Sequence, residues 1–258
     1  RLVHVDLPEK GGRLAILQIH AHQKPLADDV DLGIIAQETF GFSGAHLESL
    51  TNEAAVFALR EHSQRITQQH LSEAIDKVML GEKLECKPSQ EEMWRVSVHE
   101  SGHALLAETV NPQSVAQISV RSRGNALGYV RHYPEDDIHL YTQKMLEDQI
   151  MISLSGAVAE ELILDTRSTG AAGDYQQALH LVEKMLVSGM SPLGVVDVER
   201  LDPEQRYDVT RRILSRLEER TKEVLNRNQE RLMRIARMLE QEEVLSGEEL
   251  RVNLENLG

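Results

Sequence analysis

Two histidines and one glutamate within five consecutive residues are the group in this sequence best suited to chemistry. His99 and His103 are four residues apart, so on a helix both rings lie on one face, one turn apart. Two imidazoles placed in this way can occupy neighbouring corners of a zinc tetrahedron. Glu100 points to one side of the pair, where its carboxylate can take a proton from a water molecule that zinc activates. The motif therefore predicts a zinc peptidase site with Glu100 as general base.

The surroundings of the motif decide between this prediction and a chance occurrence, in which the histidines are ordinary helix residues. Ser89 and Glu92 form a capping box that starts a long helix through the motif. Gly102 lies inside that helix, where a glycine costs up to about 1 kcal/mol relative to alanine. Such a glycine indicates a local reason, for example the close approach of another backbone or of substrate. The helical context therefore favours the zinc site.

A third zinc ligand has to come from another part of the chain, and the candidates are the carboxylates of Glu160, Glu161, Asp165 and Asp174. Glu160 and Glu161 lie in an apolar helical stretch, where either could be a buried ligand or form a salt bridge. Asp174 follows a loop of small residues and also suits the N-cap of the next helix. The pattern of residue types does not choose among the four.

The segments that must position these residues are predicted to be mainly α-helical, because apolar residues recur at helical spacing. Before the motif, a short strand and four helices are predicted over residues 3–7, 9–22, 31–39, 43–57 and 67–78. After it, alternating residue types predict a hairpin or an edge-strand pair within 115–133. Further helices are predicted over 142–164, 174–188 and most of the remaining chain. A polar break at 81–88 separates a small all-helical unit from the rest.

Composition argues against two classes of protein. The 258 residues include 42 acidic and 28 basic residues, which give a net charge of −14. A nucleic-acid binder needs a positive face that displaces counterions, so this balance argues against nucleic acid as a partner. No stretch reaches the about 18 to 20 apolar residues that a membrane-spanning helix requires. The single cysteine, Cys86, excludes an intramolecular disulfide and fits a reducing compartment.

Several segments, in their order along the chain, resemble the FtsH family of ATP-dependent zinc metalloproteases. Three resemble its peptidase part, namely SVHESGHAL at 97–105, GAVAEELI at 156–163 and STGAAGD at 168–174. Residues 123–129, RGNALGY, resemble its active-site edge strand. Residues 41–47, GFSGAHL, and 52–55, NEAA, resemble the small helical lid of its AAA+ ATPase. The resemblance covers nearly the whole chain.

The resemblance implies a role for each residue of the metal centre. His99 and His103 would bind zinc, and Asp174 would be the third ligand. Glu100 would be the general base. Glu160 would orient a zinc-bound histidine through a hydrogen bond.

The resemblance also implies contacts with substrate and nucleotide. An extended substrate would add as a strand to residues Gly124, Ala126, Leu127, Gly128 and Tyr129. Three residues would lie near the nucleotide in the full-length protein: His20, Gly44 and Ala45. The chain contains no Gly-x-x-x-x-Gly-Lys-[Ser/Thr] phosphate loop. ATP and Mg²⁺ are therefore expected to act only in the full-length protein.

Two domains follow from the resemblance, both mainly α. Residues 1–84 would be the C-terminal helical lid subdomain of an AAA+ ATPase. Residues 85–258 would be a zinc metallopeptidase domain, mostly helical and zincin-like, with a small β-sheet or hairpin.

The expected function is that of an ATP-dependent zinc metalloendopeptidase that degrades unfolded or membrane proteins. A homo-oligomeric ring, expected to be a hexamer, would deliver them. Because the chain starts at Arg1 without an initiator Met, we expect a fragment of a longer protein. The resemblance implies that this protein is cytoplasmic. Its contact with the membrane would come only from an anchor outside this chain, which would hold it at the cytoplasmic face. The alternative is a proteolytically inactive AAA+ assembly or unfoldase subunit. The complete His-Glu-x-x-His motif and Asp174 argue against this alternative, because a lost activity usually loses a ligand.

Overall fold

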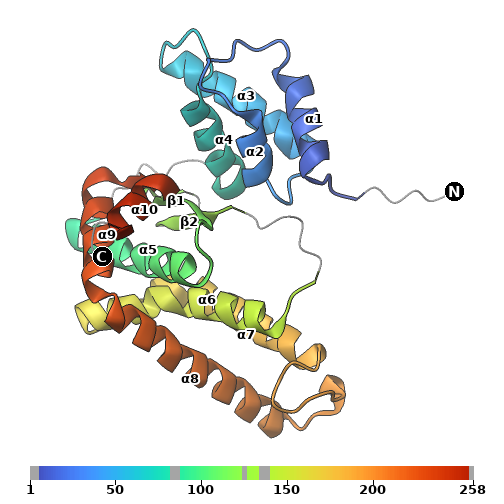
Figure 1. The fold of residues 1–258 in the computed structure, drawn as a ribbon, viewed down its shortest axis with the longest axis vertical. Helices are drawn as coiled ribbons and strands as arrows, with labels where there is room; N and C mark the ends of the chain where they lie inside the picture. The colour runs from blue at the N-terminus through green and yellow to red at the C-terminus, as the bar shows by residue number, and fades with distance from the viewer. Residues whose placement is uncertain (1–5, 82–87, 124–126, 134–139, 256–258) are drawn as a thin grey trace, which may run out of the picture. The chain divides into compact units, whose positions relative to one another are not determined.

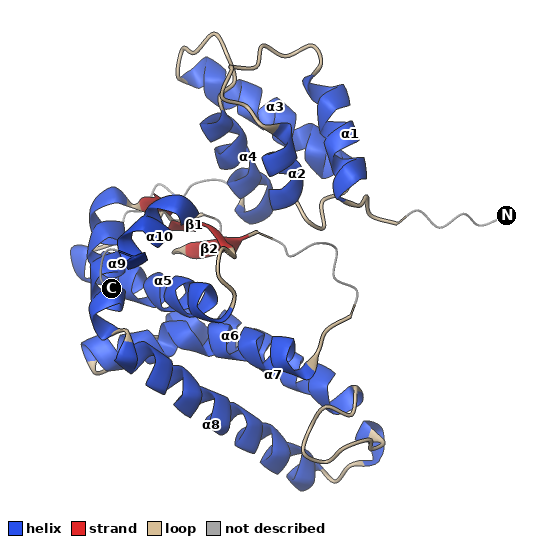
Figure 2. Ribbon diagram, in the orientation of Figure 1, coloured by secondary structure: helices blue, strands red, loops and turns tan. Residues whose placement is uncertain are grey.

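The structure, a computed structural model, describes residues 6–81, 88–123, 127–133 and 140–255. Within these ranges the chain forms ten α-helices, two short 3-10 helices and one small sheet. Figure 2 shows how far the helices outweigh the strands. The mainly α fold class predicted from the sequence is confirmed. The chain divides into two compact units, of which the first is built on α1–α4 and the second on α5–α10.

The first unit is a set of four helices (Figure 1), and they enclose one apolar core. The helices are α1 (Lys10–Ala21), α2 (Leu32–Glu38), α3 (Gly44–Arg60) and α4 (Gln68–Leu80). Ser43 and Thr67 cap α3 and α4 through their side chains, as the sequence predicts. The core contains fully buried residues from each helix, among them Leu17, Ile35, Leu47, Leu50 and Ile75.

The strand predicted at residues 3–7 is absent from the two of these residues that the structure describes. Residues 3–5 lie outside the described residues, and Asp6 and Leu7 form no strand. Leu7 is exposed. An alternating pattern becomes a strand only when a partner strand accepts its hydrogen bonds, and no described strand pairs with these two residues.

The second unit consists of longer helices packed in layers. Its helices are α5 (Gln90–Val110), α6 (Gln143–Leu164), α7 (Ala172–Val187), α8 (Pro203–Arg227), α9 (Gln229–Glu242) and α10 (Gly247–Glu255), with 3-10 turns at Thr169–Ala171 and Val198–Arg200. Helix α6 lies between α5 and α8 (Figure 1), and α9 packs on α5. Ser89 and Thr142 cap α5 and α6 through their side chains, as predicted.

The small sheet has three described strands in the order β2-β1-β3. They are β1 (Val115–Ser119), β2 (Tyr129–His132) and β3 (Val244–Ser246). The strand pair predicted within 115–133 is present as β1 and β2. Strand β3, which the sequence analysis placed in a helical tail, pairs antiparallel with β1, and Ile118 lies opposite Leu245. Three residues are too few to show alternation, so only a partner far away in the sequence reveals this strand.

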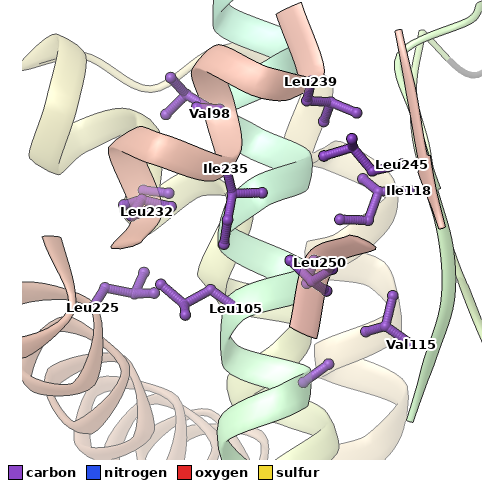
Figure 3. Close-up of a cluster of buried hydrophobic side chains, with 14 of the residues drawn as sticks. Val98, Leu105, Val115, Ile118, Leu225, Leu232, Ile235, Leu239, Leu245 and Leu250 are labelled. Atoms are coloured by element: carbon purple, nitrogen blue, oxygen red, sulfur yellow. The ribbon is translucent and has the colours of Figure 1, made fainter. Parts of the chain in front are cut away.

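Helix α5 is the centre of the larger core. Every residue from Ser97 to Glu108 is buried, as expected for a helix covered on all sides. Figure 3 shows Val98 and Leu105 of α5 beside Leu232 and Ile235 of α9. The motif residues of α5 are therefore inside the protein, where polar groups need partners.

A membrane-crossing helix is absent from the described ranges, since none of their helices combines the necessary length with the necessary hydropathy.

Candidate metal centre

Helix α5 places His99 and His103 on one face, with ring centroids 4.7 Å apart. Their Nε2 atoms are separated by 3.0 Å, and each residue is only 8% exposed. Two ring nitrogens that face each other at this distance cannot both carry a proton on the line between them. When neither nitrogen carries a proton, the two are close enough to bind one metal ion together.

Asp174 completes the cluster from the first turn of α7. Its Oδ2 atom is 3.1 Å from Nε2 of His99 and 3.6 Å from Nε2 of His103. The three ligand atoms all lie within 4.8 Å of one another. Two imidazole nitrogens and one carboxylate oxygen, with a fourth position left for water, are a donor set typical of catalytic zinc. The residues present therefore fit a zinc ion.

The N-cap alternative for Asp174 is wrong. A 3-10 turn at Thr169–Ala171 runs directly into α7, so the helix starts at Ala172 and its N-cap is Ala171. Asp174 is the third residue of the helix, and its carboxylate contacts the two histidines instead of capping the helix.

Two glycines allow α5 and α6 to come close at this site. A Cβ atom on Gly156 of α6 would lie 2.5 Å from Nε2 of His99 and 2.6 Å from Nε2 of His103. A Cβ atom on Gly102 would lie 2.6 Å from the carbonyl oxygen of Ser155. The local reason predicted for Gly102 is thus the close approach of the α6 backbone. The importance of Gly156 was not foreseen, because it depends on how the two helices meet.

The outer nitrogen of each histidine has its own partner. Nδ1 of His99 is 2.7 Å from Oε1 of Glu160, and Nδ1 of His103 is 2.7 Å from the carbonyl oxygen of Ile152. Both oxygens are acceptors, so each Nδ1 donates a proton and each Nε2 can be free for a metal. Glu160 thus contacts His99, and the orienting role that the resemblance implies for it stays a prediction. The carbonyl of Ile152 had no signal in the sequence, because every residue has one.

Glu160 is held in place by two further side chains. It is 1% exposed, and it accepts hydrogen bonds from Arg95 Nη1 at 2.8 Å and from Ser168 Oγ at 3.0 Å. Burial alone would raise the pKa of Glu160, but the hydrogen bonds from His99, Arg95 and Ser168 hold it below its ordinary value. Glu160 is therefore a stable anion beside His99. Sequence reasoning missed Arg95, because nothing in its pattern distinguishes it from a surface arginine.

Glu100 is buried beside the cluster and 7% exposed. Burial raises its pKa above the ordinary value, although the nearby histidines oppose the shift. Gly128, the residue before β2, lies directly against it, because a Cβ atom there would be 2.8 Å from Oε1 of Glu100. A buried carboxylate with a raised pKa, next to a cluster of possible metal ligands, is a candidate general base.

The charge balance of the site favours a cation. Burial would lower the pKa of His99, but its hydrogen bonds with Asp174 and Glu160, and the charge of Glu100, raise it to about 10. For Asp174 burial acts in the opposite direction and would raise the pKa, but hydrogen bonds with the two histidines hold the pKa well below its usual range. Three carboxylates around two imidazoles thus attract a positive charge, which a proton supplies when no metal is bound.

The other two candidates for the third ligand lie away from the cluster. Glu161 forms ion pairs with Lys222 at 2.8 Å and with Arg167, which is the salt-bridge alternative. Asp165 ends α6 as an exposed residue with a φ angle of 58°. Neither contacts the histidines among the described residues.

The predicted substrate and nucleotide residues have the following places. Among the predicted substrate residues, Gly124 and Ala126 lie outside the described residues. Leu127 and Gly128 lead into β2, which begins at Tyr129. Leu127 is 46% exposed. In the first unit, His20 lies near the end of α1, and Gly44 and Ala45 begin α3. Their roles remain predictions.

Comparison with known proteins finds two family models in this chain. Residues 87–210 match peptidase family M41, and residues 29–73 match the AAA+ lid domain. The M41 match includes all the residues of the metal cluster, and the lid match lies within the first unit.

Whole-chain similarity points to the same proteins. The chain is 38% identical over 279 residues to the ATP-dependent zinc metalloprotease FtsH of Thermus thermophilus, an alignment that covers 100% of this chain and 44% of the relative. It is 41% identical over 203 residues to FtsH of Syntrophotalea carbinolica, with 78% of this chain and 31% of the relative covered. It is 35% identical over 256 residues to FtsH 2 of a Thermoanaerobacter species, with 97% of this chain and 50% of the relative covered.

The chain spans half or less of the length of these curated relatives. Within that span, the peptidase model, the lid model and the relatives agree with one another and with the His-His-Asp cluster. The chain therefore belongs to the FtsH family of zinc metalloproteases, of which it carries an AAA+ lid and an M41 peptidase domain.

Proposed function

We propose that this chain is the proteolytic part of an ATP-dependent zinc metalloendopeptidase that degrades unfolded or membrane proteins. The observation that carries the proposal is the convergence of His99, His103 and Asp174 on one point, with Glu100 beside them. The names of the relatives, which are zinc metalloproteases, support the choice of metal and the class of reaction.

In this proposal the chain's own residues hold the metal and move the proton. Nε2 of His99, Nε2 of His103 and a carboxylate oxygen of Asp174 would bind zinc. When bound, zinc polarises a water molecule and the peptide carbonyl, which makes the water acidic enough to lose a proton near neutral pH. Glu100 accepts that proton and passes it to the nitrogen of the leaving amine. Glu160 keeps His99 oriented throughout.

The substrate would lie along β2. Among the described strands, β2 is at one edge of the sheet, and an extended polypeptide can add to such an edge through main-chain hydrogen bonds. Gly128 brings this edge directly against Glu100. A peptide paired with Leu127, Gly128 and Tyr129, and with Gly124 and Ala126 before them, would therefore pass the general base.

The whole protein would couple this chemistry to ATP. We assign residues 1–84 to the lid of an AAA+ ATPase and residues 85–258 to the peptidase, a division that the matches at 29–73 and 87–210 support. His20, Gly44 and Ala45 would lie near a nucleotide bound mainly by parts outside this chain. A hexameric ring at the cytoplasmic face of a membrane would deliver unfolded protein.

The test is removal and return of the metal. The chain is stripped with a chelator, its zinc content is measured, and cleavage of a quenched unstructured peptide is followed as zinc is added. We expect one zinc per chain and activity that rises with zinc occupancy. A folded chain that takes up no zinc would refute the proposal and favour the assembly-subunit alternative.

A further inference from the structure

We propose that Arg95 is a positioning residue of the metal centre, which, given the zinc site proposed above, organises two of its three ligands at once. Arg95 lies on α5 four residues before His99. Its side chain is 27% exposed, yet it reaches Glu160, whose side chain is 1% exposed. It thus connects the surface of α5 with the interior of the site.

The first connection runs to His99. Arg95 Nη1 donates to Oε2 of Glu160 at 2.8 Å, and Oε1 of Glu160 lies 2.7 Å from Nδ1 of His99. With both carboxylate oxygens bound, the Glu160 side chain cannot rotate without breaking a hydrogen bond. The plane of the His99 ring, and so the direction of its Nε2, is fixed by the position of Arg95.

The second connection runs to the segment that carries Asp174. Arg95 Nη1 donates to the carbonyl oxygen of Thr166 at 2.9 Å, and Nη2 donates to Thr166 Oγ1 at 3.1 Å. Thr166 follows α6 and leads through the 3-10 turn into α7 and Asp174. Ser168, on the same segment, donates to Glu160 Oε1 at 3.0 Å. The segment is therefore fastened to the same carboxylate that orients His99.

The geometry needs an arginine. Two nitrogens of one guanidinium serve three acceptors on two residues, and the planar fork sets their relative directions. A lysine carries one ammonium group and can retain the pairing with Glu160 or with Thr166, but cannot reproduce the fork. Arg95→Lys should therefore recover only part of what Arg95→Ala loses.

The test measures the dissociation constant for zinc by competition with a chelating dye, beside the melting temperature of the metal-free protein. We expect Arg95→Ala to weaken zinc binding by about tenfold to a hundredfold, as other residues that orient metal ligands do. Arg95→Lys should lie between Arg95→Ala and the wild type. In a double-mutant cycle, Arg95→Ala and Glu160→Gln should be less than additive, because both act on His99 through one carboxylate.

A matched control separates positioning from fold stability. Arg216→Ala removes an arginine whose Nη2 pairs with Glu147 at 2.7 Å, between α8 and α6. It should lower the melting temperature of the metal-free protein without changing its affinity for zinc.

The proposal would be overturned if folded Arg95→Ala bound zinc as tightly as the wild type does. It would also be overturned if Arg216→Ala lost as much zinc affinity as Arg95→Ala. If Arg95→Ala does not fold, Arg95→Lys and Ser168→Ala decide the matter by the same measurement, and wild-type affinity in both would overturn it. A wild-type chain that binds no zinc would instead overturn the proposed function, so the two failures are distinguishable.

Discussion

The two histidines of the metal centre are fixed by what their outer nitrogens already bind. Glu160 accepts from Nδ1 of His99, and the carbonyl of Ile152 accepts from Nδ1 of His103. Each Nε2 is left to face Asp174. A site assembled in this way is ordered before a metal arrives, because its hydrogen bonds belong to the protein alone.

Adding one methyl group at Gly156 tests this geometry. In Gly156→Ala, the new Cβ would lie within 2.6 Å of both Nε2 atoms, so the rings must move out of line. We expect zinc binding to weaken by at least about tenfold, since even residues that only orient ligands have effects of this size. Isothermal titration with zinc measures the effect.

Gly173→Ala is the matched control. Gly173 is next to Asp174 on α7, and a Cβ atom there would meet no atom within 4 Å. Both variants replace a helical glycine by alanine, a change that by itself favours the helix by up to about 1 kcal/mol. Zinc affinity should be unchanged in Gly173→Ala, and a similar affinity in Gly156→Ala would contradict the packing described here.

At this scale, residue type and spacing predicted part of the site. His99, Glu100 and His103 could be identified from a helical repeat, because three positions in one helix have a known relation in space. Asp174 was one of four candidates from the residues alone, and only the resemblance to a family selected it. Arg95 could not be predicted, because its role depends on where α6 ends relative to α5.

Helix α6 is the element on which the second unit depends, because it faces the His-His-Asp cluster on one side and α8 on the other. On the first side small residues allow a close approach to α5. On the second side charges bridge the two helices: Arg216 and Arg220 pair with Glu147, and Lys222 pairs with Glu161. The stability of the contact between α6 and α8 therefore depends on pH.

Glu147 provides the prediction at this scale. Burial would raise its pKa, but Gln143, Arg216 and Arg220 hold it below the ordinary value of 4.5. A carboxyl whose pKa is lowered by folding adds stability above its unfolded pKa and loses it as the pH falls through the folded value. We expect Glu147→Gln to reduce the free energy of unfolding by about 1 kcal/mol at pH 7, and by much less near pH 3.

Urea unfolding at the two pH values measures this difference. Asp208→Asn is a suitable comparison, because Asp208 pairs with Arg211 and Arg212 only at 3.8 and 3.9 Å on the surface of α8. It should change stability very little at either pH. A deficit in Glu147→Gln that stays constant between pH 7 and pH 3 would show that the ion pairs are not its cause.

The prediction of elements succeeded where periodicity is long and failed where pairing is distant. Helices such as α6 have many turns and a capping residue, so their starts and ends were close to the sequence expectation. Strand β3 has three residues and pairs with a strand more than a hundred residues earlier. The start of α7 was placed two residues late, because the 3-10 turn before it has no distinctive residue pattern.

For the whole molecule, the two compact units carry different features. The first contains the match to an AAA+ lid, and the second contains the metal cluster. The chain has no phosphate loop, and the groups that would carry out hydrolysis of a peptide all lie on α5 and α7. Chemistry in this chain should therefore not need ATP.

A rate measurement tests that separation. We expect the zinc-loaded chain to cleave a short unstructured peptide at the same rate with and without ATP and Mg²⁺, because a short peptide needs no unfolding. An increase in the rate on addition of ATP would contradict the prediction, and would show that this chain binds nucleotide productively. Inorganic tripolyphosphate, tested in the same assay, controls for chelation of metal by the phosphate chain of ATP.

The central claim is that a zinc ion and Glu100 together cleave peptide bonds, and one comparison tests it most directly. The wild type and Glu100→Gln are each loaded with one equivalent of zinc, and cleavage of a quenched peptide is measured beside zinc affinity. Glutamine keeps the shape of the side chain but cannot accept the proton. We predict similar zinc affinity and a loss of cleavage of at least about a hundredfold in the variant. Equal cleavage by both proteins, or none by the zinc-loaded wild type, would contradict the claim.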